Sequence, residues 1–370
     1  MALQTFHINP RAPEPEKLRE AAGILSRGGL LAFPTETVYG LAARGDLGEA
    51  MVRLRALKRR PEGERFTLHI GGLDQLDAGR LRISEAAHRL MDRFWPGPLT
   101  LILPTDSGGT LGVRYPAHPV AQALLKVAGG PVYATSANPR GKPPPSSAEE
   151  VAAYFPEGLD GLVDAGPAAI RQASTIVETD GDAWAVLREG LVSWEMAARA
   201  VARRILFVCT GNSCRSPMAQ ALFEIAAARR LGVPTGDLLR QGLLAQSAGT
   251  AAMPFGRASE HAQRIIRERG GDLSGHVPSP LTQEVLDRAD EIYAMSRFHA
   301  ERIARLSPRA GALVRLLSSD GGEMADPIGG SEAEYRACAE QIERGIATIL
   351  DTTLAHPRPR ERRAAGGKSP

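Results

Sequence analysis

The stretch VCTGNSCRSPMAQALF, from Val208 to Phe223, decides the fold of the second half of this chain. It overlaps the apolar run ILFVC (Ile205–Cys209), which is typical of a buried strand, and continues into a helical pattern over Met218–Leu231. Cys209 and Arg215 bracket five residues between strand and helix. A loop of this length can turn its backbone N–H groups inward around an anion, and the helix N-terminus adds positive potential. The stretch therefore predicts an anion-binding loop.

The residue types in this loop suit nucleophilic chemistry at phosphorus. A free thiol has a pKa near roughly 8.5, and a helix N-terminus with a nearby arginine lowers it, so we expect Cys209 to be a thiolate. The planar guanidinium of Arg215 can hold two phosphoryl oxygens. In the loop ADPIGGS (Ala325–Ser331), Asp326 is a candidate general acid. An isolated Asp-Pro is otherwise typical of a simple turn, so the assignment depends on the cysteine loop.

The combination of CTGNSCRSP with ADPIGGS downstream resembles the low-molecular-weight protein tyrosine phosphatase family over residues 204–353. The resemblance implies a phosphocysteine intermediate on Cys209, transition-state binding by Arg215, Asp326 as acid and then base, and no metal. The phosphate loop that it implies also contains Thr210, Gly211, Asn212, Ser213, Cys214 and Ser216. In this family a second loop cysteine can form a reversible disulfide with the nucleophile. Cys214 is therefore a candidate redox partner, or else a small packed side chain.

Two positions bear on the phosphoryl group that is removed. Tyrosine-specific relatives usually carry an aliphatic residue where Ser213 stands and aromatic residues after the Asp-Pro, whereas Ile328 and Gly329 follow it here. A small polar residue at 213 resembles the relatives that act on phosphoarginine, although these more often have Thr there and Phe after Pro. The sequence favours phosphoarginine modestly and leaves phosphotyrosine open.

The first half contains several clusters of small, hydroxyl and basic residues. GGLLAFPTETVYGLAA (Gly28–Ala43) is a strand followed by a turn, and LKRRPEGERFTLHI (Leu57–Ile70) contains four cations. ATSANPRGKPPPSS (Ala134–Ser147) ends a strand before a proline-rich loop. Each cluster alone is compatible with an ordinary strand–loop corner or a solvated basic face. Clustered cations also suit a polyphosphate, so together they predict an anion-binding α/β domain.

In this order the clusters resemble the YrdC-type threonylcarbamoyl-adenylate synthases over residues 13–198, chiefly through Lys58-x-Arg60 and Ser136-x-Asn138. The resemblance implies condensation of L-threonine, bicarbonate and ATP to threonylcarbamoyl-AMP and pyrophosphate, for the threonylcarbamoyl modification of tRNA adenosine. The ATP contacts that it implies are Lys58, Arg60, Thr110, Ser136, Asn138 and Arg188. The threonine contacts that it implies are Thr35, His69, Arg114, Ala134 and Ser174.

This synthase resemblance carries further expectations. Mg²⁺ is expected because ATP phosphates usually bring it. The partners would be the tRNA-modification machinery and tRNA itself, whereas a phosphoprotein is the expected substrate of the phosphatase half. Relatives usually have Pro-Leu where this chain has Phe66-Thr67, so we expect a different loop shape near the nucleotide. Two alternatives remain open for the first half: a non-catalytic RNA- or nucleotide-binding module, and carbamoyl transfer to another substrate.

The length and composition limit the number of domains and the class of protein. A chain of 370 residues suits two domains, and a net charge of +3 argues against a strongly basic nucleic-acid binder. Three cysteines argue against a disulfide framework. No signal-peptide core and no apolar run of about 18 residues is present, so we expect a cytoplasmic protein without membrane contact.

The expected fold class is α/β throughout. A mixed-sheet YrdC-like domain would be followed by a parallel-sheet phosphatase domain, because strands and helices alternate regularly in the second half. The junction is expected near Arg199–Arg204, after a short helix. Residues 356–370, basic and rich in Pro and Gly, are expected to be a disordered tail.

Overall fold

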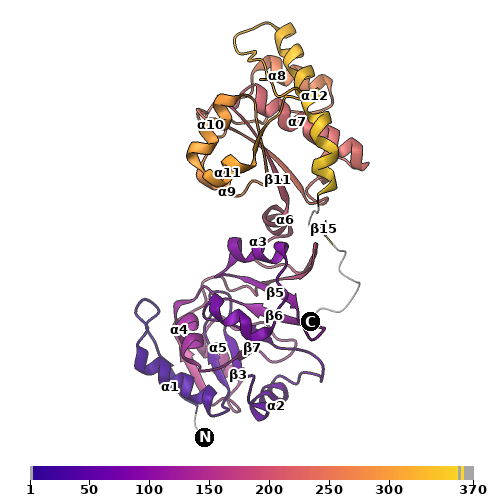
Figure 1. Ribbon diagram of the computed structural model, residues 1–370. Helices are drawn as coiled ribbons and strands as arrows, with labels where there is room; N and C mark the ends of the chain where they lie inside the picture. Colours follow the sequence, from indigo (N-terminus) through magenta and orange to yellow (C-terminus); the bar gives the residue numbers. More distant parts are fainter. Residues whose placement is uncertain (1–2, 357–359, 362–370) are drawn as a thin grey trace. The chain divides into compact units, whose positions relative to one another are not determined.

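The computed structural model describes residues 3–356 and 360–361 (Figure 1). The chain divides into two compact units, Met1–Val201 with Glu361–Pro370, and Ala202–Arg360. The division falls at the end of helix α6 (Trp194–Val201), within the stretch where the sequence places the junction. Each unit is built around its own sheet and its own buried cores.

The N-terminal unit contains a mixed sheet in the order β1-β8-β2-β3-β7-β4-β6-β5-β9-β10-β15. Its strands are β1 (Gln4–His7), β2 (Leu31–Phe33), β3 (Gly40–Arg44), β4 (Thr67–His69), β5 (Leu99–Pro104), β6 (Thr110–Arg114), β7 (Val132–Ser136), β8 (Gly161–Asp164), β9 (Thr175–Asp180), β10 (Ala183–Arg188) and β15 (Arg360–Glu361). The pairs β1–β8, β2–β8, β4–β6 and β5–β9 are parallel, whereas β2–β3, β3–β7, β4–β7, β5–β6 and β9–β10 are antiparallel. The predicted mixed sheet is confirmed.

Helices cover both faces of this sheet because alternate residues of a strand point to opposite sides. In β2, Leu31 and Phe33 join the core beneath α1 (Pro15–Ser26) and α4 (Pro119–Val127). Leu30 and Ala32 join the core formed with α2 (Gly48–Leu57) and α5 (Ala148–Tyr154). The remaining helices of this unit are η1 (Leu73–Gly79) and α3 (Glu85–Phe94), besides α6.

The C-terminal unit contains a four-stranded sheet in the order β12-β11-β13-β14, with every pair parallel. The strands are β11 (Arg203–Cys209), β12 (Leu243–Gly249), β13 (Glu291–Ala294) and β14 (Val314–Leu316). The helices are α7 (Arg215–Leu231), η2 (Thr235–Asp237), α8 (Glu260–Glu268), α9 (Gln283–Asp287), α10 (Arg297–Leu306), α11 (Pro308–Leu313) and α12 (Glu332–Ala355). The predicted parallel α/β unit is confirmed.

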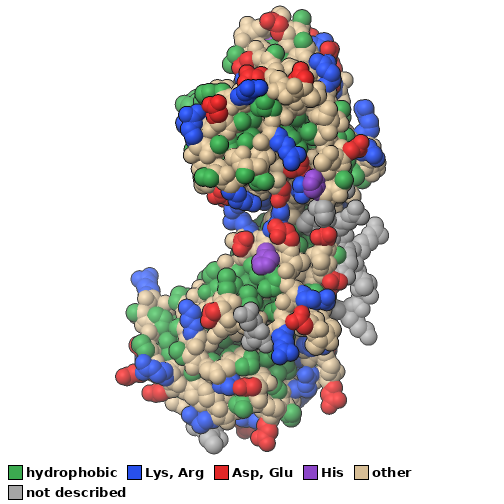
Figure 2. Space-filling view, in the orientation of Figure 1, with side chains coloured by type: hydrophobic (Ala, Val, Ile, Leu, Met, Phe, Trp, Pro, Cys, Tyr) green, Lys and Arg blue, Asp and Glu red, His purple; other side chains and the backbone are tan. Residues whose placement is uncertain are grey.

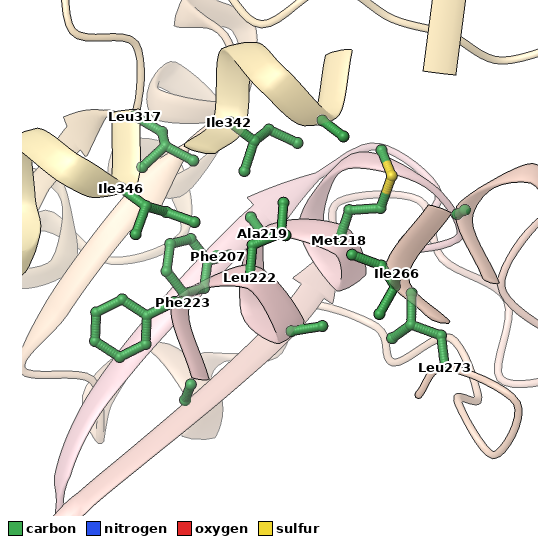
Figure 3. Close-up of a cluster of buried hydrophobic side chains, with 14 of the residues drawn as sticks. Phe207, Met218, Ala219, Leu222, Phe223, Ile266, Leu273, Leu317, Ile342 and Ile346 are labelled. Atoms are coloured by element: carbon green, nitrogen blue, oxygen red, sulfur yellow. The ribbon is translucent and has the colours of Figure 1, made fainter. Parts of the chain in front are cut away.

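The alternation of β11 again divides two cores. Phe207 packs with Met218, Leu222 and Phe223 of α7 and with Ile342 of α12 (Figure 3). Leu206 and Val208 belong to the core on the opposite face, which includes residues of α9, α10 and α11. The chain leaves β11 for β12 on one side and later returns to β13 on the other, so the strand order reverses at β11. In open parallel sheets ligands bind at this point, beyond the carboxyl ends of the strands.

Helix α9 is capped by the Thr282 hydroxyl, which accepts from the Val285 amide, and α12 runs to Ala355. Most of the tail expected to be disordered lies outside the described residues, but Arg360–Glu361 form strand β15. Within the described residues, no helix is long and apolar enough to cross a membrane. On the face drawn in Figure 2, acidic and basic side chains are interspersed over each unit.

Candidate active sites

The predicted anion loop lies at the carboxyl end of β11. Cys209 is the last residue of the strand, and α7 begins at Arg215. Asn212 has a φ of 52°, a left-handed conformation that asparagine adopts more readily than most residues. Gly249, at the end of neighbouring β12, lies directly against the loop: a Cβ there would stand 2.5 Å from the Thr210 carbonyl oxygen. Only glycine admits so close an approach of two backbones.

The sulfur of Cys209 lies at the floor of this loop. The Asn212 amide donates to Cys209 Sγ at 3.3 Å, and Ser216 Oγ lies 2.9 Å from the same sulfur. Asn212 Nδ2 donates to Ser216 Oγ at 2.8 Å, and the Ser279 amide donates to Asn212 Oδ1 at 2.7 Å. The side chains around the sulfur are thus fixed from two sides of the loop.

The pKa of Cys209 departs from the expectation. Burial raises the pKa of the Cys209 thiol, which is 2% exposed, and the contacts with Ser216, the Asn212 amide and Arg215 oppose this rise. The sequence predicts a lowered pKa from the helix N-terminus and the arginine, and this direction is wrong. Exclusion of solvent disfavours the charged form and has the larger effect.

Arg215 and Asp326 face each other across the loop. Arg215 is buried, and its Nη2 is ion-paired with Asp326 Oδ2, while its Nη1 donates to the Met324 carbonyl oxygen at 3.4 Å. The Asp326 side chain is 43% exposed, so it can meet both a bound group and solvent. The structure therefore places the three predicted catalytic residues at one loop.

Further groups that sequence reasoning missed also reach this loop. His299 Nε2 lies 2.9 Å from Thr210 Oγ1, and its Nδ1 lies 2.7 Å from Ser296 Oγ. Burial lowers the pKa of His299 to about 4, so its ring is neutral near pH 7. His276 Nε2 donates to the Asn212 carbonyl oxygen at 2.8 Å. These histidines carry no spacing relation to the loop, so the sequence offers no signal for them.

The second loop cysteine packs against a helix. Cys214 Sγ lies 3.1 Å from the Tyr335 hydroxyl of α12, and both residues are buried. Cys209, Cys214 and Cys338 are all free thiols. Cys214, the candidate redox partner, therefore packs against α12.

The N-terminal unit contains a cavity of about 870 Å³ between the ends of several strands. All eleven residues predicted for ATP and threonine line it: Thr35, Lys58, Arg60, His69, Thr110, Arg114, Ala134, Ser136, Asn138, Ser174 and Arg188. They come from segments more than 150 positions apart in the chain. The fold thus gathers the scattered sequence clusters around one space.

One end of the cavity combines cations with strand-end carbonyl groups. Lys58 Nζ donates to the Ser136 carbonyl oxygen at 2.7 Å and to the Asn138 carbonyl oxygen. Burial, followed by repulsion from Arg60, lowers the pKa of Lys58 to about 8. Arg60 is ion-paired with Glu64 at 3.0 Å. The charge of Lys58 is thus sensitive to pH just above neutrality.

Phe66 packs against two cations at this end. Its ring is 3% exposed and lies beneath two guanidinium groups, with Arg55 Cζ at 5.3 Å and Arg60 Cζ at 4.9 Å from the centroid. Such contacts are favourable because the ring face is negative. Phe66 therefore supports Arg60 from behind.

The other end of the cavity contains a buried arginine. Arg114 Nη2 donates to Glu36 Oε1 at 2.9 Å and to Thr37 Oγ1 at 2.5 Å. Its Nε has no partner among the described residues, although the side chain is buried. Burial, together with the nearby Arg114, lowers the pKa of His69 to about 3, so His69 is neutral. An unpaired buried donor in a cavity is suited to an anionic ligand.

Arg188 and Ser174 close the side wall. Arg188 Nη2 donates to the Ser174 carbonyl oxygen at 2.8 Å, and Ser174 Oγ lies 2.9 Å from Thr100 Oγ1. The cavity is therefore lined by several cations and by hydroxyl groups. Among the described residues that line it, Glu64 is the acidic one.

Known proteins resemble the two units separately. Residues 23–190 match the Sua5/YciO/YrdC family, described as telomere recombination, and residues 204–358 match the low-molecular-weight phosphotyrosine protein phosphatase family. A threonylcarbamoyl-AMP synthase of Pyrococcus abyssi is 41% identical over 184 residues, covering 47% of this chain and 54% of that protein. The chain thus spans about half the length of this relative.

Two further relatives are shorter. A threonylcarbamoyl-AMP synthase of Halorhodospira halophila is 37% identical over 188 residues, covering 48% of this chain and 97% of that protein. The solved structure of a YwlE mutant from Bacillus subtilis is 35% identical and covers 41% of this chain and 99% of that one, with a TM-score of 0.37. The chain therefore belongs to the Sua5/YciO/YrdC family over its first half and to the low-molecular-weight phosphotyrosine protein phosphatase family over its second.

Proposed function

We propose that the chain is a bifunctional enzyme. Its N-terminal unit would condense L-threonine, bicarbonate and ATP to threonylcarbamoyl-AMP and pyrophosphate, and its C-terminal unit would hydrolyse phosphoprotein through a phosphocysteine. The observation that supports the first activity is the convergence of all eleven candidate residues on one cavity. The names of the relatives over this half point to the same reaction.

The synthase residues would act by positioning and charge neutralisation. Arg60 and Lys58 carry positive charge to one end of the cavity, where the ATP phosphates would lie. The unpaired Nε of Arg114 would donate to the threonine carboxylate at the other end. His69 is neutral, so it adds no charge beside Arg114. No protein nucleophile is required, because orientation and neutralisation together account for large rate effects.

Mg²⁺ would arrive with the nucleotide. Among the described residues, no three His, Cys, Asp or Glu side chains are grouped to hold a metal ion. Mg²⁺ is commonly held by phosphate oxygens, water and one or two carboxylates, which fits a cavity whose one acidic lining residue is Glu64. When bound, Mg²⁺ supplies charge neutralisation at the phosphates.

Pyrophosphate release tests the synthase proposal. The full chain should release pyrophosphate from ATP only when threonine and bicarbonate are both present. If release needs neither, the first half has another activity; if nucleotide binds without any release, the non-catalytic binding module is correct. Release with bicarbonate and an acceptor other than threonine would favour the alternative carbamoyl transfer. The product would supply tRNA modification, in which the tRNA-modification machinery and tRNA are the partners.

The phosphatase steps follow from the loop. Cys209 Sγ, once deprotonated, would attack phosphorus; the S–P bond forms while the P–O or P–N bond to the protein side chain breaks. Asp326 would give its proton to the leaving atom. Arg215 would exchange its carboxylate partner for two phosphoryl oxygens. Water, deprotonated by Asp326, would then attack phosphorus and release phosphate and the Cys209 thiolate. The observation that supports this is the placing of Cys209, Arg215 and Asp326 at one anion-binding loop.

Phosphoarginine is the favoured substrate residue. Ser213 is small and polar, and Ile328 supplies no aromatic ring after the Asp-Pro. The test compares turnover of phosphoarginine and phosphotyrosine by the full chain. Faster hydrolysis of phosphotyrosine would reject this preference and keep the phosphatase assignment. Both activities use reactants of the cytoplasm, and three free thiols suit a reducing compartment.

A further inference from the structure

Exposed apolar side chains gather around the phosphate loop. Six large apolar side chains of the described C-terminal unit are more than a third exposed: Met253, Phe255, Val277, Phe298, Leu306 and Ile328. Five of these, all except Leu306, lie within four residues of a residue that hydrogen-bonds to the loop or is ion-paired with Arg215. Such a concentration is unusual for a soluble surface, where exposed apolar residues are normally scattered singly.

The segment between β12 and α8 is tied to the loop at both ends. The Ala251 amide donates to the Thr210 carbonyl oxygen, and the Ser259 amide donates to the Ser213 carbonyl oxygen, each at 2.9 Å. Met253 and Phe255 lie between these anchors and are 57% and 67% exposed. They stand within four residues of an anchor, a span of at most about 14 Å of extended chain.

Two other segments bring an apolar side chain to the same place. Phe298 is 58% exposed and precedes His299, whose ring lies against Thr210 of the loop. Ile328 is 69% exposed and lies two residues after Asp326, the ion-pair partner of Arg215. We call Met253, Phe255, Phe298 and Ile328 the apolar rim.

The size of the rim exceeds what one phosphorylated side chain can cover. A single aromatic side chain contributes roughly 150–250 Å² when it is buried, and four large apolar groups offer several hundred together. A phosphoarginine or phosphotyrosine side chain enters the loop itself and contacts only part of this area. The remainder is available to the neighbours of the phosphorylated residue in a polypeptide.

We propose that the apolar rim binds the residues flanking the phosphorylated side chain, and that the preferred substrate is a polypeptide segment with apolar residues next to it. This inference rests on the proposed phosphatase function. The occupant follows from continuity: the rim adjoins the loop that would hold the phosphoryl group, so whatever reaches the loop also reaches the rim. Apolar flanks would be favoured because covering apolar surface on both partners releases water.

Three substrates distinguish the contribution of the rim to kcat/KM from that of the phosphate loop. p-Nitrophenyl phosphate probes the loop, and two phosphopeptides of equal net charge carry either Leu and Phe or Ser and Gln on both sides of the phosphorylated residue. We expect the full chain to hydrolyse the apolar-flanked peptide with a kcat/KM about tenfold above that of the polar-flanked one, the scale expected for one well-covered apolar side chain.

Variants then assign the preference to the rim. Phe298→Ser and Ile328→Ser should each cut kcat/KM for the apolar-flanked peptide severalfold more than for p-nitrophenyl phosphate, and Phe298→Leu should restore most of the loss. Leu306→Ser, an exposed apolar position at the far end of α10, is the matched control. It should leave the ratio of kcat/KM between the apolar-flanked peptide and p-nitrophenyl phosphate unchanged.

The outcomes distinguish the two levels of the proposal. Equal kcat/KM on the two peptides, or equal losses on all three substrates in the rim variants, overturns the apolar rim while leaving the phosphatase. A third outcome is equal kcat/KM on the two peptides, together with self-association of the wild-type chain that Phe298→Ser abolishes. This outcome would assign the rim to a second copy of the chain and would also overturn its role in substrate binding. No hydrolysis of p-nitrophenyl phosphate contradicts the phosphatase itself and the rim with it.

Discussion

The two candidate sites are built in opposite ways. The phosphate loop is one contiguous segment at the end of β11, and the Asn212 amide, the Ser216 hydroxyl and the start of α7 lie close to the sulfur of Cys209. The cavity of the N-terminal unit has no such segment: side chains from β4, β6, β7 and β10, among others, meet around about 870 Å³. The first site depends on local backbone geometry, and the second depends on the whole sheet. A substitution should therefore affect one site without the other.

The largest expected effect is the loss of Cys209. Cys209→Ser keeps the volume but removes the thiol nucleophile, so phosphatase turnover should fall by at least about 10⁴-fold. Threonine-dependent pyrophosphate release by the same protein should remain. Turnover of p-nitrophenyl phosphate, with circular dichroism to verify folding, provides the measurement. A variant that retains near-normal turnover would rule out the phosphocysteine.

The next effect concerns Arg60. Arg60→Ala removes a cation and its contact with the Phe66 ring, so kcat/KM for ATP should fall by about 10²–10³-fold, as for other preorganised charge-stabilising groups. Arg59→Ala is the matched control, because Arg59 is an exposed neighbour that does not line the cavity. If both variants lose activity equally, general positive charge rather than the Arg60 position matters. Phosphatase turnover should not change in either.

The pH dependence of ATP affinity tests the role of Lys58. Its pKa is lowered to about 8, so the free site loses this positive charge as pH rises through about 8, and ATP affinity should fall by roughly tenfold above it. Lys58→Arg keeps its charge and should flatten the profile. Nucleotide binding by calorimetry from pH 7 to pH 9.5 measures this. Equal pH dependence in the two proteins would show that Lys58 does not contact the phosphates.

The smallest effect concerns His299. Its pKa is lowered to about 4, whereas in the unfolded chain it titrates near 6.5, so the unfolded state binds a proton first as pH falls. The free energy of unfolding should therefore decrease from about pH 6.5 to pH 4, by roughly 2 kcal/mol between pH 7 and pH 5 for this group. His299→Gln should lack that part of the decrease. Urea titrations at the two pH values measure the free energy of unfolding of both proteins. An equal decrease from pH 7 to pH 5 in the two proteins would be evidence against a buried neutral imidazole.

The contrast between the sites also explains what the sequence could predict. The phosphate loop is contiguous, so its strand, turn and helix are predictable from residues 205–231 alone. His299 approaches Thr210 across 89 positions, and no local pattern encodes that contact. The direction of the Cys209 pKa was wrong for a similar reason, because exclusion of solvent depends on residues far away in the chain. In the N-terminal unit, composition alone predicted only an anion-binding domain, and family motifs supplied the residues.

The apolar rim is a further product of distant segments. The sequence drew attention to Ile328 as the absence of an aromatic platform, whereas the structure places Phe255 and Phe298 on other segments tied to the same loop. Aromatic side chains are therefore available near the phosphate loop without following the Asp-Pro. Spacing along the chain could not reveal this, since the anchors lie on three separate segments.

The central claim is that one chain contains two complete and separable active sites. The most direct measurement assays both activities, threonine- and bicarbonate-dependent pyrophosphate release and p-nitrophenyl phosphate hydrolysis, on the full chain, Cys209→Ser and Arg60→Ala. We predict a crossed pattern: Cys209→Ser abolishes hydrolysis and keeps pyrophosphate release, and Arg60→Ala does the reverse. Parallel loss of both activities in either variant, or no pyrophosphate release by the unaltered chain, would contradict the account.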